Sequence, residues 1–145
     1  MEYTQKLDDR DVLALYKYLC EYEDCLKEEY GRFNIYDENI NKFKNKNELF
    51  LGSVNLKNDK ETAHKKKNYL LWKEGSLKRK KANVDRAHAL LRRIRNAFAH
   101  GALVDNQNGS FQIKDEDNGI ITLDGLISYP LLYQLIEELK KTKKQ

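Results

Sequence analysis

The sequence predicts a mainly α fold, namely an antiparallel bundle of about four to five helices with a small β-hairpin before the C-terminal helix. Apolar residues recur at steps of three and four in several segments, which is the period of an amphipathic helix. Charged residues make up 34% of the chain and the mean hydropathy is −0.84, which favours a thin bundle over a thick α/β core. Residues 1–145 match one domain in size and contain no linker-like stretch, so we expect a single domain.

The first half of the chain is expected to supply three helices. An apolar repeat over residues 8–30 predicts the first of them. Residues 34–51 fit a shorter or broken helix, and residues 54–60 look like a loop. The third helix is expected over residues 61–74, polar at first and apolar toward its end, and residues 78–81 would then form a basic connector.

The clearest helix covers residues 83–99. Its apolar stripe advances by three or four residues through Val84, Ala87, Leu91, Ile94 and Phe98. Four polar residues lie together on one flank of this stripe, namely His88, Arg92, Arg95 and Asn96. Gly101 follows His100, so we expect the helix to end or bend there. That change of direction would release His100 from the offset of ~140° that a continuous helix imposes between it and Arg95.

A β-hairpin is expected over residues 110–123, which alternate in part between apolar and polar side chains. The composition of Asp115–Asn118 predicts its turn. Residues 126–141 return to a helical pattern, in which Pro130 occupies an early position that suits proline.

Positive charge is clustered in this chain, although the net charge is only +4. Basic residues gather at residues 57–67, at residues 78–81 and in the C-terminal tail. They form either a phosphate-attracting surface or ordinary solvated faces, and composition leaves both interpretations open. The chain has no long apolar run and its N-terminus lacks a signal-peptide core, so we expect a cytoplasmic protein without membrane contact. Cys20 and Cys25 would then be reduced thiols.

The segment from Arg92 to Gly101 carries the strongest functional signal. It places Arg95 and His100 five residues apart, with Asn96 directly after the arginine. A guanidinium binds phosphate through paired, charge-assisted hydrogen bonds, and an imidazole exchanges protons near neutral pH. This pair can therefore act on a phosphodiester without a metal or an organic cofactor, and we expect neither. A metal-dependent hydrolase is disfavoured because the acidic residues do not cluster with histidines at ligand spacing.

In this motif and its setting, the sequence resembles the HEPN superfamily (higher eukaryotes and prokaryotes nucleotide-binding domain). Members carry Arg-x4-6-His, often with Asn, Asp or His directly after the arginine, as Arg95–His100 does here. The likeness covers residues 83–139, which include the hairpin and the last helix. It implies a metal-independent ribonuclease, commonly a homodimer with two motifs facing one cleft. Many members are toxins or phage-defence components, some with a minimal nucleotidyltransferase as antitoxin.

The motif residues support cleavage of RNA, in which the 2′-hydroxyl attacks the neighbouring phosphodiester and leaves 2′,3′-cyclic phosphate and 5′-hydroxyl ends. His100 would act as general base or acid, Arg95 would neutralise charge on the phosphoryl oxygens, and Asn96 would orient either group. DNA lacks the 2′-hydroxyl and should not be cut. The expected RNA contacts are basic side chains, namely Arg92, Lys78, Arg79, Lys80 and Lys81.

Structural explanations for these residues stay open at this point. Arg95 would otherwise form an ion pair with another helix, and His100 would interact with the last carbonyls of its own helix. Tyr69 and Trp72 would either stack on bases or belong to the core. Two rival functions also stay open: a non-catalytic nucleotide- or RNA-binding module, and a protein-interaction domain.

Overall fold

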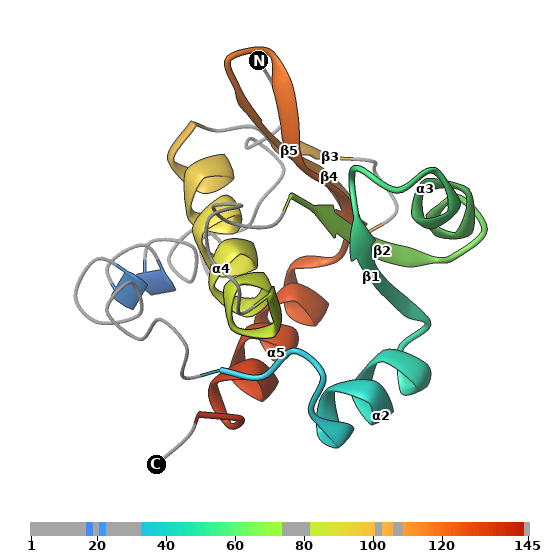
Figure 1. Cartoon of the computed structure of the whole chain (residues 1–145), viewed down its shortest axis with the longest axis vertical. Coiled ribbons are helices and arrows are strands. Elements are labelled where there is room, and N and C mark those ends of the chain that lie inside the picture. The colour runs from blue at the N-terminus through green and yellow to red at the C-terminus, as the bar shows by residue number, and fades with distance from the viewer. Residues whose placement is uncertain are drawn as a thin grey trace.

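A five-stranded mixed β-sheet lies at the centre of the molecule, with the strand order β1-β2-β5-β4-β3 (Figure 1). This computed structural model describes residues 17–18, 21–22, 33–73, 82–100, 103–105 and 109–143. The prediction of a mainly α helical bundle is therefore wrong, because the chain forms an α/β fold in which helices cover the faces of a sheet.

The strands are β1 (Leu49–Ser53), β2 (Asn68–Trp72), β3 (Leu103–Asp105), β4 (Phe111–Asp117) and β5 (Ile120–Ile127). The helices with defined bounds are α2 (Glu38–Lys46), α3 (Lys57–Ala63), α4 (Ala82–His100) and α5 (Tyr129–Lys140). β1 and β2 run parallel, whereas the other neighbouring strands in the order pair antiparallel.

β1, α3 and β2 form a parallel crossover unit where the sequence predicts helices and a loop. Residues 34–51 contain both α2 and β1, and α3 begins inside the expected loop over residues 54–60. The apolar end of the helix expected over residues 61–74 is β2. All five residues of β2 are buried. An apolar run that is buried on both sides of a sheet cannot be distinguished from a buried helix by its periodicity.

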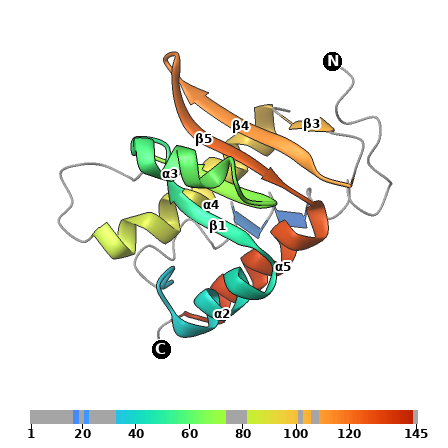
Figure 2. The ribbon, with the colours of Figure 1, turned by 90° about the vertical axis from the view of Figure 1, so that its right-hand side faces the viewer.

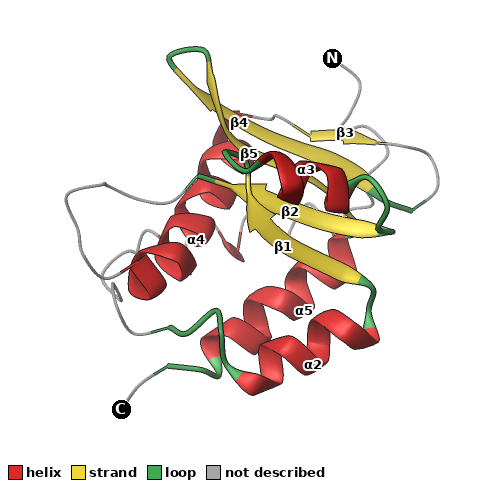
Figure 3. Ribbon diagram, turned by 45° about the vertical axis from the view of Figure 1, so that its right-hand side comes forward, coloured by secondary structure: helices red, strands yellow, loops and turns green. Residues whose placement is uncertain are grey.

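The sheet separates two hydrophobic clusters. α4 packs on one face, against β2, β4 and β5, and α3 packs on the other, against β1 and β2 (Figure 2). The larger cluster, on the α4 face, extends to α5, α2 and the helical residues Tyr18 and Tyr22. The smaller cluster lies beneath α3 and consists of Val54, Ala63, Tyr69 and Leu71. α2 and α5 lie side by side at one edge of this arrangement (Figure 3).

Two of the predicted helices are confirmed. The helix expected over residues 83–99 is α4, whose buried apolar residues from Ala87 to Ala97 lie in the larger cluster. The helix expected over residues 126–141 is α5, which begins later because β5 continues to its last residue, Ile127. Ser128 caps α5, since its Oγ accepts a hydrogen bond from the backbone N–H of Leu131 at 3.2 Å.

The predicted hairpin is also confirmed, but its turn lies at Asn118 and Gly119 instead of Asp115–Asn118. These two residues have φ angles of 54° and 81°, which lie in the left-handed region. Two-residue hairpin turns require such angles, and Asn-Gly adopts them at low cost. β4 therefore continues to its last residue, Asp117, and Asp115 lies within a strand.

Several predicted features lie outside the described residues. Residues 17–18 and 21–22 are helical, as expected for the helix over residues 8–30, but the rest of that segment lies outside. So do Cys20, Cys25, Gly101 and the basic connector at residues 78–81. Within the described part of the chain, no helix has the length and apolar character needed to cross a bilayer.

Candidate functional site

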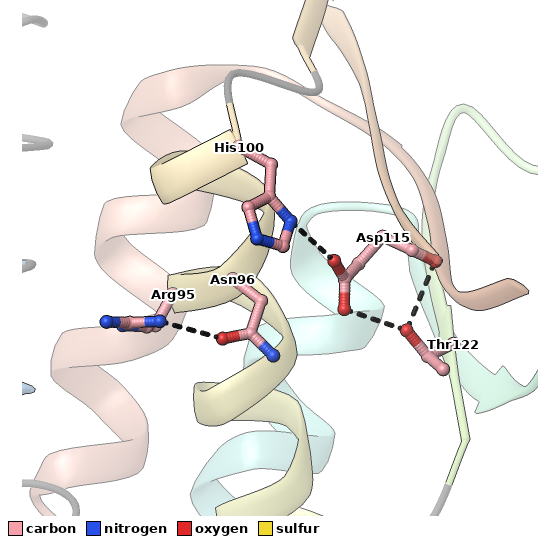
Figure 4. A network of polar contacts seen from close by, with 5 residues as sticks. All are labelled: Arg95, Asn96, His100, Asp115 and Thr122. Atoms are coloured by element: carbon pink, nitrogen blue, oxygen red, sulfur yellow. Dashed lines mark hydrogen bonds and ion pairs between the residues drawn. The ribbon is translucent and has the colours of Figure 1, made fainter. Parts of the chain in front are cut away.

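His100 is the last residue of α4, and 64% of its side chain is exposed. Its Nδ1 lies 3.4 Å from Oδ1 of Asp115, which is on β4 (Figure 4). This distance is slightly longer than the range of about 2.7–3.2 Å for an ordinary N–H···O hydrogen bond. The contact is therefore an electrostatic one that a small movement of the exposed ring would convert into a hydrogen bond.

Asp115 is a buried carboxylate, with 3% of its side chain exposed. It follows Phe111 and Ile113 at alternate positions of β4, so it lies on the face of the sheet that α4 covers. Its Oδ2 accepts a hydrogen bond from Oγ1 of Thr122 at 2.9 Å. Its Oδ1, which lies toward His100, has no hydrogen-bond partner among the described residues. Because a buried carboxylate is costly without partners, the hydrogen bond from Thr122 stabilises this one.

A β-bulge gives Thr122 its position. Asp115 is paired with Leu123, and Glu116 is paired with Ile121, so Thr122 has no opposite residue in the ladder between β4 and β5. Its buried hydroxyl lies within hydrogen-bonding distance of both the backbone oxygen and the carboxylate of Asp115. Bulges re-aim side chains in this way and are frequent next to active sites.

Arg95 and Asn96 form a second polar pair on α4, in which Nη1 of Arg95 donates to Oδ1 of Asn96 at 3.1 Å. The helix continues through His100, so the five-residue spacing imposes an offset of ~140° between Arg95 and His100. The expectation that the helix end would release His100 from this offset is wrong. Figure 4 shows the guanidinium extending away from the His100 ring, and among the described residues no hydrogen bond or ion pair joins the two. One chain alone does not bring these two groups together.

Arg93 lies on the same side of α4 as His100, because the two residues are seven apart and therefore nearly aligned along the helix. Burial and the like charge of Arg92 lower the pKa of Arg93, whereas the nearby carboxylates of Asp115 and Asp117 raise it. The Nε atoms of Arg92 and Arg93 are buried and have no hydrogen-bond partner in the part of the chain that the structure describes. The positively charged Arg93 therefore lies near the pair formed by His100 and Asp115.

Sequence reasoning missed Asp115, Thr122 and Arg93. The available signal for Asp115 was Asn118-Gly119, because this dipeptide marks a two-residue hairpin turn and so places Asp115 in the preceding strand. Arg93 could have been found from its seven-residue spacing to His100. The bulge at Thr122 has no sequence signal that we recognise.

The two candidate stacking aromatics are part of the core. Trp72 is fully buried, and its Nε1 donates to the backbone oxygen of Arg86 at 2.9 Å. The Arg86 guanidinium lies 4.5 Å from the centre of the Trp72 ring, a distance typical of a cation–π contact. Tyr69 lies in the smaller cluster, where burial raises the pKa of its hydroxyl. Neither ring presents a free face to a base.

Other expected site features are only partly covered by the described residues. The basic residues proposed to contact RNA, Lys78, Arg79, Lys80 and Lys81, lie outside them. Among the residues that are described, no group of three or more His, Cys, Asp or Glu side chains is arranged to hold a metal ion.

The chain is similar to a known protein family. The family model described as HEPN pEK499 p136 matches residues 12–144, a range that includes the sheet, α4 and α5. No curated protein and no solved structure matches the chain. The matched range contains Arg95, Asn96, His100 and Asp115, so the site described above lies within the region that defines the family match.

Proposed function

The chain belongs to the HEPN pEK499 p136 family, and from this premise we propose that it is a metal-independent endoribonuclease. The observation that supports this most strongly is the exposed imidazole of His100 at the end of α4, beside a buried carboxylate and on a helix that also carries Arg95 and Asn96. The imidazole is accessible to a phosphodiester, and the arginines of α4 supply the charge that such a substrate needs.

The proposed reaction is a transesterification within RNA. Nε2 of His100 accepts the proton of a 2′-hydroxyl while the 2′-oxygen bonds to the neighbouring phosphorus. The bond between phosphorus and the 5′-oxygen breaks, and that oxygen takes a proton from a second acid. Arg95 stabilises the negative charge on the non-bridging oxygens in the transition state. The products are a 2′,3′-cyclic phosphate and a 5′-hydroxyl end.

The proposal includes a homodimer, because Arg95 and His100 lie on different sides of α4 within one chain. Two copies that face each other across α4 would bring Arg95 of one copy toward His100 of the other. The second copy's His100, in its imidazolium form with a proton on each ring nitrogen, would also supply the acid for the leaving oxygen. By its resemblance to HEPN toxins, the protein would act as a toxin or a defence component, with an antitoxin such as a minimal nucleotidyltransferase as a further partner.

A second candidate function is a non-catalytic module that binds RNA or nucleotides. The observation that favours it is the adjacent pair Arg92 and Arg93 on α4, two partly exposed guanidinium side chains of the type that binds phosphate oxygens. This function needs the positive charge of α4 but does not need His100.

Incubation of the purified chain with RNA and with DNA of the same sequence, in excess EDTA, tests the proposal. We expect cleavage of RNA alone, with 2′,3′-cyclic phosphate ends. The His100→Ala variant should lose about 10²- to 10⁴-fold in rate, the usual contribution of a general acid or base. His64→Ala is the control, because His64 follows α3 on the opposite face of the sheet and should leave the rate unchanged.

Each other outcome has a definite meaning. RNA that is bound but not cut would replace the nuclease with the binding module. Loss of cleavage in EDTA would contradict the metal-independent mechanism. An active protein that sediments as a monomer would contradict the shared site.

A further inference from the structure

We propose that Asp115 is a positioning residue that fixes the tautomer of His100. In this arrangement Nδ1 of His100 carries the proton and donates it to Oδ1 of Asp115, so that Nε2 is left unprotonated and faces the substrate. Thr122 holds the carboxylate in place from the other side. The consequence for catalysis rests on the proposed ribonuclease function, but the tautomer itself does not depend on it.

The first argument is the environment of the carboxylate. Asp115 is 3% exposed, and its two oxygens have different surroundings. Oδ2 is held by the hydroxyl of Thr122, whereas Oδ1 has no hydrogen-bond partner among the described residues and lies 3.4 Å from Nδ1 of His100. A buried, unpaired carboxylate oxygen is a strong acceptor. The nearest ring nitrogen of His100 is therefore the one that should carry a proton.

The second argument is the backbone that supports the carboxylate. The bulge between Asp115 and Glu116 leaves Thr122 unpaired and brings its hydroxyl to Asp115. The carboxylate thus occupies a rigid strand in the larger cluster, while His100 lies at the exposed end of a helix. A buried acceptor beside an exposed ring orients the ring, and the hydrogen bond at one nitrogen sets the protonation of the other.

Two other charged residues lie near His100 and Asp115, one on α4 and one on β4. Arg93 on α4 lies close enough to Asp115 for the carboxylate to raise its pKa, and Asp117 on β4 has the same effect on Arg93. Arg93 and Asp117 remain in place when Asp115 is changed. Because the change also removes one negative charge near Arg93, the test needs a control for that loss of charge. Asp117→Asn supplies this control, because it removes one charge from the same strand at an exposed position that acts on Arg93, whereas the carboxylate in contact with His100 is that of Asp115.

The rival explanation is purely structural. Asp115 would stabilise the end of α4 through His100 without selecting either tautomer. Under that explanation, removal of the carboxylate would lower the melting temperature but would leave both the tautomer of His100 and the RNA cleavage rate of the folded protein unchanged.

Long-range ¹H–¹⁵N spectra of the full chain labelled at histidine nitrogens decide between the two, at a pH where the ring is neutral. The His100→Ala variant assigns the resonances. We expect the wild type and Asp117→Asn to show the Nδ1–H tautomer. Asp115→Asn should switch to Nε2–H, because the asparagine amide that accepts from Thr122 through its oxygen presents its NH₂ group to Nδ1. In a serine protease the equivalent change costs ~10⁴-fold in rate, and we expect at least about 10-fold here because His100 is exposed.

A wild-type spectrum with the Nε2–H tautomer would overturn the proposal, and so would an unchanged tautomer in folded Asp115→Asn. If Asp115→Asn does not fold, the wild-type tautomer alone still decides the question. If the tautomer switches in Asp115→Asn but the wild type cuts no RNA, the result would support the positioning of His100 and overturn the ribonuclease proposal. The two proposals therefore fail separately.

Discussion

The β-sheet carries one aspartate toward α4 and another toward α3, and each has a histidine nearby. Asp115, on the α4 face, is 3% exposed, accepts a hydrogen bond from Thr122 and lies 3.4 Å from His100. Asp124, on the α3 face, is about half buried, and its Oδ1 has no hydrogen-bond partner among the described residues. Three separate basic side chains act on it, namely Lys114, His64 and Lys60.

The two faces differ in the size of the hydrophobic cluster that surrounds each carboxylate. The α4 face holds the larger cluster, in which α2, α4 and α5 meet the sheet, whereas the α3 face holds a small cluster beneath a helix of seven residues. A close-packed interior allows one position for each side chain. On the α3 face, the basic side chains that act on the carboxylate are exposed. The difference suggests that His100, and not His64, is the histidine held in a defined orientation.

The largest expected difference between the two faces is in stability, and two single substitutions at adjacent leucines of β2 would reveal it. Leu70 lies in the larger cluster and Leu71 in the smaller one, and both are almost fully buried. We expect Leu70→Ala to lower the free energy of unfolding toward the upper end of the range of about 2–5 kcal/mol, and Leu71→Ala toward its lower end. The short helix α3 can settle into the space that Leu71 leaves, whereas the elements around Leu70 hold one another in place.

Urea denaturation of the two variants, beside the wild type, measures this difference. The two leucines share a strand and a backbone environment, so each is the control for the other. Equal losses of stability would show that the α3 face is packed as rigidly as the α4 face, and the contrast between the two carboxylates would then need another cause.

The Thr122→Val variant should have the next largest effect. Valine keeps the shape of threonine but removes the hydroxyl that donates to Asp115. Because the acceptor is a buried carboxylate, we expect the unfolding free energy to fall by about 1.5–3 kcal/mol. Thr62→Val on α3 is the control and should change it by less than about 0.5 kcal/mol. A loss equal to that of the control would mean that Thr122 does not hold the carboxylate.

The sequence predicts the elements whose pattern is local and misses those that depend on pairing across the sheet. The amphipathic stripe of α4, the hairpin and α5 are each visible within one segment. β2 is buried by α4 on one side and α3 on the other, so its apolar run has no alternation, and β1 and β3 are too short to show one. The α/β fold is a consequence of these three strands, and the bundle prediction fails because of them.

The same distinction applies to the candidate site. Arg95, Asn96 and His100 can be found from the sequence because they lie within one helical turn and a half of one segment. Asp115 and Thr122 belong to the site only because a turn at Asn118-Gly119 and a bulge in the hairpin bring them to the end of α4. Their placement depends on the register of two strands, which no spacing in the sequence reveals.

The smallest expected effect on stability is that of Asp124→Asn, which should raise the free energy of unfolding instead of lowering it. Burial raises the pKa of Asp124 in the folded state, although Lys114, His64 and Lys60 lower it in part. A raised folded pKa means that this group stabilises the fold only below its unfolded pKa of about 3.9 and that this contribution is lost as the pH rises through the folded pKa. At neutral pH the variant should therefore be more stable than the wild type, by less than about 1 kcal/mol because the half-exposed carboxylate is screened.

Thermal unfolding of Asp124→Asn from pH 7 down to about pH 3 checks this sign, since the gain in stability should shrink as the wild-type carboxyl becomes protonated. Glu61→Gln, at an exposed position of α3, is the control and should show no such trend. A variant that is less stable than the wild type at neutral pH would mean that the cations around Asp124 outweigh its burial. The α3 face would then hold its carboxylate as firmly as the α4 face does, and the choice of His100 over His64 would rest on the motif alone.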